Sequence, residues 1–151
     1  MGLVWAGNPT HPNDGVRSIS LKQLAPLAAA NVEFHSLQKG PAVSQIAADG
    51  RGLRLIDHHQ DLNDYVDTAA LISCLDLVIA VDTSVAHLAG ALGAPTWVLL
   101  PFVADCRWLV ARNDSPWYPT MRLFRQTRRG QWDEAIEAVA QALQFRAKSR
   151  L

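Results

Sequence analysis

The chain has 151 residues, about the length of one domain, with 49% apolar residues and a mean hydropathy of +0.02, which supplies a packed core and argues against disorder. Fourteen basic side chains balance fourteen acidic ones, so the charge gives no case for binding nucleic acid, which needs a basic stripe. No apolar run reaches the length of a membrane span and no signal peptide opens the chain, so we expect a soluble, cytoplasmic protein. The two cysteines, Cys74 and Cys106, are expected to be free thiols in a reducing compartment.

Strand and helix signals alternate from the first residues onward. The expected elements of the first half are a strand over 2–6, a helix over 21–30 capped by Ser20, a strand over 32–37, a short helix over 41–48, a turn over 49–52 and a strand over 53–56.

The second half keeps the same alternation. Its expected elements are a helix over 65–75, a strand over 77–81, a helix over 85–92, a strand over 96–100, a long loop over 101–119, a strand over 121–125 and an amphipathic helix over 132–145. Six strands alternating with helices predict one α/β domain over residues 1–151. We expect a doubly wound, mainly parallel six-stranded Rossmann-like sheet with strand order 3-2-1-4-5-6 and helices on both faces.

The switch between the buried strand at 77–81 and the small-residue helix after it is the strongest candidate for a ligand site. The first free N–H groups of that helix point out of the carboxyl edge of the sheet, where open α/β sheets hold anions. We expect Asp82 to cap the helix, while Thr83 and Ser84 offer backbone N–H and hydroxyl donors to a phosphate. His87 follows three residues after Ser84 and can share their helix face. The plainer interpretation is helix capping beside a packed histidine.

Two loops leave predicted strands at the same edge. The first, residues 7–18, carries Asn8, which tolerates unusual backbone angles, and Arg17, whose planar charged fork suits phosphate. Its length favours a function, because structureless loops of about a dozen residues are otherwise uncommon. Lys39 follows the second strand. The alternative for both basic residues is a solvated surface position.

Three other features are weaker. Asp67 and Thr68 open a predicted helix, where a carboxylate could accept from a ribose hydroxyl, although helix capping is the stronger interpretation. The adjacent pair His58-His59 resembles a metal site, but neighbours on an extended chain point apart and no spacing completes a ligand set, so we expect no metal. The sequence has no G-x-G-x-x-G after a strand, no P-loop lysine motif and no G-x-S-x-G elbow, which argues against a NAD enzyme, a P-loop NTPase and an α/β-hydrolase.

The segment DTSVAHLAGALGAPTWVLLP resembles the donor-binding lobe of GT-B glycosyltransferases, in particular the heptosyltransferase family. GLVWAGNPTHPNDGVRS, SLQKGP, DTAALISCLDLVIAVDT and RWLVARNDSPWYPTMRLFRQ resemble the C-terminal part of bacterial tetratricopeptide-repeat (TPR) proteins that end in such a lobe. The resemblance covers nearly the whole chain.

The resemblance implies specific roles for the candidate residues. In the family the turn and helix matching Asp82, Thr83, Ser84 and His87 hold the diphosphate of a sugar nucleotide, and a basic residue such as Arg17 or Lys39 helps to neutralise it. The base and ribose lie along the region matching residues 57–68. The implied donor is a UDP- or ADP-linked sugar, with no cofactor and no metal.

The resemblance also implies a missing partner. GT-B enzymes have two Rossmann-like lobes with the active site between them, and the acceptor lobe that carries the catalytic base is absent from this sequence, as are TPR repeats. We therefore expect the nucleotide-sugar-binding lobe of a bacterial, metal-independent glycosyltransferase, inactive in isolation unless a homodimer rebuilds the cleft. A non-catalytic nucleotide-binding module and a purely structural domain are the alternatives.

Overall fold

The computed structural model describes residues 1–149, and six parallel strands form the centre of the fold. In chain order the strands are β1 (Gly2–Val4), β2 (Phe34–Ser36), β3 (Leu55–Asp57), β4 (Val78–Val81), β5 (Thr96–Leu100) and β6 (Met121–Arg125). They lie in the order β3-β2-β1-β4-β5-β6, and every neighbouring pair is parallel. The predicted doubly wound sheet and its strand order are confirmed.

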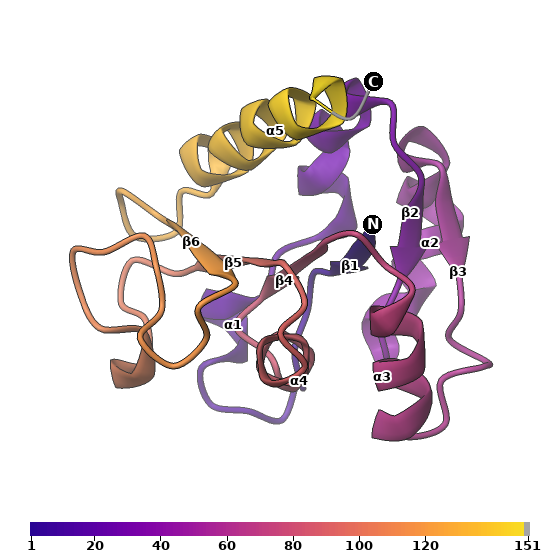
Figure 1. Ribbon diagram of the computed structural model, residues 1–151, viewed down its shortest axis with the longest axis horizontal. Coiled ribbons are helices and arrows are strands. Elements are labelled where there is room, and N and C mark those ends of the chain that lie inside the picture. Colours follow the sequence, from indigo (N-terminus) through magenta and orange to yellow (C-terminus); the bar gives the residue numbers. More distant parts are fainter. Residues whose placement is uncertain (150–151) are drawn as a thin grey trace.

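Helices cover both faces of this sheet. The α-helices are α1 (Asp14–Arg17), α2 (Gln45–Asp49), α3 (Tyr65–Ser73), α4 (Ser84–Ala91) and α5 (Asp133–Lys148). The 3-10 helices are η1 (Leu21–Ala30), η2 (Pro41–Ser44), η3 (Gly50–Leu53) and η4 (Cys106–Trp108). Figure 1 shows α5 on one side of the sheet and α4 on the other.

The core is therefore split into two layers by the sheet. One layer packs the leucines of η1 and the apolar stripe of α5 against alternate strand residues such as Leu3, Ile79 and Leu99. The other packs Ile72 of α3 and Ala86 of α4 against the opposite strand residues. Alternation along each strand divides its side chains between the two faces, which is why nearly every residue of β4 and β5 is apolar.

The segment 21–30 was predicted as a helix, and it forms a 3-10 helix. Its buried residues Leu21, Leu24, Leu27 and Ala30 recur every three positions, and a 3-10 helix with three residues per turn brings such positions onto one line. Pro26 lies inside it and has no N–H for an α-helical ladder. At its start, the Ser20 N–H donates to Gln23 Oε1 at 2.9 Å.

Other boundaries shift by a few residues. The strand predicted over 53–56 begins at Leu55, because the expected turn at 49–52 is a 3-10 helix that extends to Leu53. The short helix predicted over 41–48 divides into η2 and α2. Strands β5 and β6 have the predicted bounds. These offsets do not change the face or the edge of the sheet on which any candidate residue lies.

Candidate functional site

A cavity of about 680 Å³ lies at the carboxyl edge of the sheet, where the loops after β1 and β2 meet the starts of α3 and α4. Its wall includes five residues singled out from the sequence for ligand binding: Asn8, Arg17, Lys39, Thr83 and Ser84. Parallel strands bring their carboxyl ends together at one edge, which explains how loops distant in sequence come to share this cavity. The strand order predicts a ligand crevice at this edge, and the cavity lies there.

The two helices that start at this cavity have different N-termini. At α3, Asp64 is the N-cap, and its carboxylate accepts from the N–H groups of Val66 and Asp67 at 2.7 and 3.0 Å. At α4, Thr83 is the N-cap and no side chain within residues 1–149 caps the first N–H groups. The Thr83 hydroxyl instead donates to the Val81 carbonyl at 3.2 Å. The first N–H groups of α4 therefore lie at the cavity without a side-chain cap, and they carry the partial positive charge of the helix end.

Arg17 is held close to the start of the first loop. Its guanidinium Nε lies 3.3 Å from Asp14 Oδ1, and the side chain is mostly buried. A Cβ built on Gly7 would lie only 2.6 Å from Arg17 Nη2, so glycine at position 7 is what allows this approach. The arginine is thus anchored in the cavity wall by packing and by an ion pair within its own helix α1.

Lys39 and Asn8 also line the cavity but have different neighbours. The Lys39 ammonium donates to the carbonyl of His59 at 2.7 Å. That acceptor is neutral, so the bond orients the ammonium without cancelling its charge. Asn8 Oδ1 accepts from the N–H and the hydroxyl of Thr10, each at 3.0 Å, which makes a local turn. Lys39 therefore brings a cation to the cavity, and Asn8 shapes the loop.

Asp82 does not cap α4, contrary to the expectation from sequence. Its buried carboxylate lies 3.7 Å from His87 Nε2. Burial alone would raise the pKa of the Asp82 carboxyl, but interactions with His87 and the Trp108 indole, together with the charge of Arg107, hold that pKa below its ordinary value. The carboxylate faces its own turn and the loop after β5 rather than the helix N–H groups, since the cap position falls one residue later.

His87 lies one helical turn after Thr83, and its side chain contacts the long loop after β5. Its ring stacks on Trp108 with centroids 5.1 Å apart, and its Nδ1 lies 3.2 Å from the Tyr118 hydroxyl. It is not among the residues of the described chain that line the cavity. The geometry fits a clasp, in which Asp82, His87, Trp108 and Tyr118 join α4 to the long loop after β5.

The remaining candidates have structural partners. Asp67 accepts from the Asn63 N–H at 2.9 Å, and the Thr68 hydroxyl donates to the Asp64 carbonyl, so both residues support the start of α3. Sequence reasoning had missed Asp64 itself, although an aspartate one residue before a predicted helix is an N-cap signal. Asp67 carries a lowered pKa because it accepts from the backbone and side chain of Asn63.

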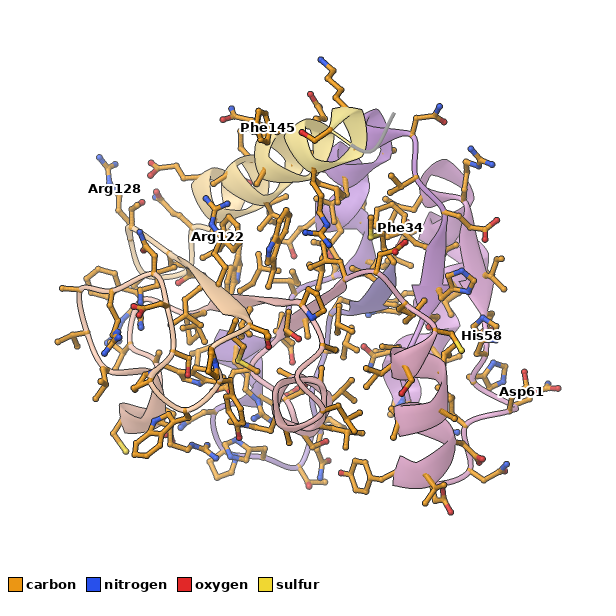
Figure 2. All side chains as sticks on the ribbon, in the orientation of Figure 1. Phe34, His58, Asp61, Arg122, Arg128 and Phe145 are labelled. Atoms are coloured by element: carbon orange, nitrogen blue, oxygen red, sulfur yellow. The ribbon has the colours of Figure 1, made fainter. Side chains whose placement is uncertain are left out.

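His58 and His59 have separate partners at the β3 edge of the molecule, where Figure 2 labels His58 and Asp61. His58 Nε2 lies 2.9 Å from His35 Nδ1, whereas His59 Nδ1 lies 2.7 Å from Asp57 Oδ2. Within residues 1–149, no three His, Cys, Asp or Glu side chains are grouped so that they could hold a metal ion. Both cysteines are free, as predicted, and both are exposed.

Comparison with known proteins supports the assignment of the fold. Residues 64–99 match the model of a family described as glycosyltransferase family 9 (heptosyltransferase). This segment includes α3, β4, α4 and most of β5, and so both helix starts at the cavity. Protein FlbA of Caulobacter vibrioides is 33% identical over 130 residues, which cover 82% of this chain and 21% of that protein. The chain thus spans about a fifth of the length of this curated relative.

Two solved structures share the fold. E. coli heptosyltransferase WaaC with ADP superimposes with a TM-score of 0.64 at 13% identity, over 97% of this chain and 44% of that chain. E. coli ADP-heptose lps heptosyltransferase II superimposes with a TM-score of 0.67 at 14% identity, over 98% of this chain and 47% of that chain. The chain therefore has a glycosyltransferase-like α/β fold and corresponds in extent to less than half of each enzyme. Among the described residues, no helix is both long and apolar enough to cross a membrane.

Proposed function

We propose that this chain is the donor-binding lobe of a metal-independent GT-B glycosyltransferase and holds the diphosphate of a sugar nucleotide in the cavity at the carboxyl edge. The observation that carries the proposal is the contrast between the two helix starts. Asp64 closes the start of α3, whereas the first N–H groups of α4 have no side-chain cap in the described chain and lie at the cavity. An anion at this point would receive hydrogen bonds and the favourable end of the helix dipole.

The charges around the cavity support an anionic ligand. Arg17 and Lys39 line it from two different loops, and the ammonium of Lys39 has a neutral carbonyl as its hydrogen-bond acceptor. Two cations and the α4 terminus can together offset the charge of a diphosphate. This arrangement uses only groups of the chain and needs no bridging metal ion.

The start of α3 offers a wall for the nucleoside. Tyr65 lines the cavity although 60% of its surface is exposed, and Leu62 lies buried beside it. A nucleobase placed against Tyr65 would cover this exposed ring, and base–aromatic stacking is sequence-tolerant because every base has a π-face. The match of residues 64–99 to the family 9 model supports the same assignment, because that segment includes both the α3 and the α4 starts.

The chemical role follows from where charge develops. When the sugar leaves its nucleotide, the departing diphosphate gains negative charge, and donors already fixed at its position stabilise that charge without reorganising. The α4 N–H groups, Ser84, Arg17 and Lys39 would provide this stabilisation. An acceptor and its base must come from outside the chain, which spans 44% and 47% of the two similar enzymes. We propose that an acceptor lobe or a TPR region of a longer cytoplasmic protein provides them.

Titration tests the proposal directly. ADP, UDP, GDP and their sugar conjugates are titrated calorimetrically into the chain and into the variants Arg17→Gln and Lys39→Gln, with Lys22→Gln on η1 as the control. Loss of one charge-assisted hydrogen bond should weaken nucleotide binding about tenfold, whereas Lys22→Gln should leave it unchanged. Absence of binding at millimolar nucleotide, or equal affinities in all four proteins, would overturn the proposal.

A nucleotide-binding module without catalysis is the second candidate, and the partial span of the similar enzymes favours it for the isolated chain. Orientation of donor against acceptor is a large share of glycosyl-transfer acceleration, and half a cleft cannot provide it. We expect the purified chain to bind nucleotide but to transfer no sugar. Robust transfer by a monomer would contradict this, so mass in solution is measured in the same samples to identify a homodimer that rebuilds the cleft.

A further inference from the structure

The buried glutamine at the carboxyl end of β2 connects the two loops that line the cavity. Gln38 lies two residues beyond the end of β2 and is only 2% exposed. Its Oε1 accepts from the N–H groups of Trp5 and Ala6 at 3.1 and 2.9 Å. Its Nε2 donates to the carbonyls of Ala6 and Lys39 at 2.9 and 2.8 Å.

These four hydrogen bonds use the whole capacity of the carboxamide, which has two acceptor sites and two donors. Strand β1 ends at Val4 and β2 at Ser36, so the backbone ladder between them stops before the cavity. The Gln38 side chain continues it by binding both backbone groups of Ala6. A side chain that is so completely engaged serves to hold backbone in place, because it has no free polar atom for a ligand.

We infer that Gln38 is a positioning residue for the ligand site: it fixes the loop that carries Asn8 and Arg17 relative to the loop that carries Lys39. The first loop leaves β1 through Ala6, and Lys39 follows Gln38 directly, so both loops are tied to one carboxamide. The spacing of the two cations across the cavity depends on this tie. This inference rests on the proposed function, because the spacing of Arg17 and Lys39 matters only if one diphosphate contacts both.

The chain offers a matched control in Gln126. It follows β6 at the same edge of the sheet, is 5% exposed, and accepts with Oε1 from the N–H groups of Phe102 and Gly130 at 3.0 and 3.1 Å. It therefore also ties loops after neighbouring strands, but it is not among the residues of the described chain that line the cavity. Replacing either glutamine with methionine keeps the length of the side chain and removes its hydrogen bonds.

The experiment compares Gln38→Met and Gln126→Met with the wild-type chain. Thermal unfolding should show a lower midpoint for Gln38→Met, which loses four hydrogen bonds. Gln126→Met loses two and also removes a buried Nε2 that has no partner among the described residues, so its midpoint should fall less. Calorimetric titration with ADP, UDP and inorganic pyrophosphate should show about tenfold weaker binding for Gln38→Met only, because its two cations no longer meet the phosphates together. If both variants bind as the wild type does, or lose affinity equally, Gln38 has no positioning role. If Gln38→Met does not fold, Gln38→Asn replaces it: the shorter carboxamide adds no charge but cannot reach all of the backbone groups of Trp5, Ala6 and Lys39, and weaker nucleotide binding is again expected.

Amide hydrogen exchange without ligand separates this inference from the proposed function. In Gln38→Met, exchange should accelerate at the N–H groups of Trp5 and Ala6, which donate to the carboxamide, while Gln126→Met should accelerate it at those of Phe102 and Gly130. Unchanged exchange at Trp5 and Ala6 in Gln38→Met would overturn the tie, whether or not nucleotide binds. A wild-type chain that binds no nucleotide, with the exchange pattern as expected, would instead contradict the proposed function and limit Gln38 to ordering the loops.

Discussion

Replacing His87 with alanine distinguishes a ligand contact from a structural clasp. The imidazole stacks on Trp108, lies within hydrogen-bonding distance of the Tyr118 hydroxyl, and has its Nε2 3.7 Å from the Asp82 carboxylate. All three partners belong to the protein, and His87 does not line the cavity in the described chain. We therefore expect His87→Ala to reduce stability and to leave nucleotide binding nearly unchanged.

The magnitude follows from the lost contacts. A net hydrogen bond is worth about 0.5–1.5 kcal/mol and an aromatic pair about 0.5–1.5 kcal/mol beyond its buried area. Together with a partly unfilled space beside Trp108, the free energy of unfolding should fall by about 2–3 kcal/mol. For a chain of this length, this loss corresponds to a decrease in Tm of about 4–12 °C.

Urea unfolding and nucleotide titration measure the two effects separately. Ser84→Ala is the matched variant, because Ser84 is exposed at the first position of α4 and lines the cavity. Ser84→Ala should leave the urea midpoint unchanged and weaken nucleotide binding, which is the reverse of the pattern expected for His87→Ala. An unchanged midpoint with weakened binding in His87→Ala would refute the clasp and return His87 to the ligand site.

Two further predictions concern Gly90 within α4 and Asp82 just before this helix. Gly90→Ala should destabilise the protein by about 1–2 kcal/mol, because the added Cβ would lie 2.6 Å from Tyr118 Cγ and closer still to Met121 Cε, and overpacking outweighs the gain in helix propensity. Gly15→Ala, whose Cβ would meet nothing within 4 Å, should be neutral or stabilising. Equal urea midpoints for the two variants would contradict the close approach at Gly90. The lowered pKa of Asp82 contributes stability that is present above the ordinary carboxyl pKa and is lost as pH falls through the folded value. Asp82→Asn should therefore be less stable than the wild type at pH 7, with the difference shrinking below about pH 4, and a difference that stays constant down to acid pH would show that Asp82 has no such role.

The alternation of apolar runs with helix signals was enough to predict the sheet. The bounds of β5 and β6 could be predicted to the residue, because a proline lies close before each run, apolar residues fill most of β5, and Met121, Leu123 and Phe124 supply the buried side of β6. The helical type of η1 was harder to foresee. Its leucine spacing of three fits both a helix stripe and a 3-10 line, and the one sequence feature that favours the 3-10 form is Pro26, which has no N–H for an α-helical ladder.

Part of the candidate site could also be predicted from the sheet topology. Loops that follow neighbouring parallel strands must meet at one edge, so Arg17, Lys39 and Ser84 could be brought together from topology alone. The orientation of His87 could not be predicted from topology, because it depends on which loop packs against α4. The loop that carries Trp108 and Tyr118 has no regular sequence pattern that would show this packing. Gln38 could not be singled out either, since a buried amide is recognised only when its four backbone partners are known.

The position of a bound nucleoside diphosphate tests the account most directly. A crystal structure of the chain grown with ADP or UDP should place the phosphates within hydrogen-bonding distance of the first N–H groups of α4, with Arg17 and Lys39 on either side and the base beside Tyr65. A nucleotide bound at any other surface, with the cavity between α3 and α4 unoccupied, would contradict the account.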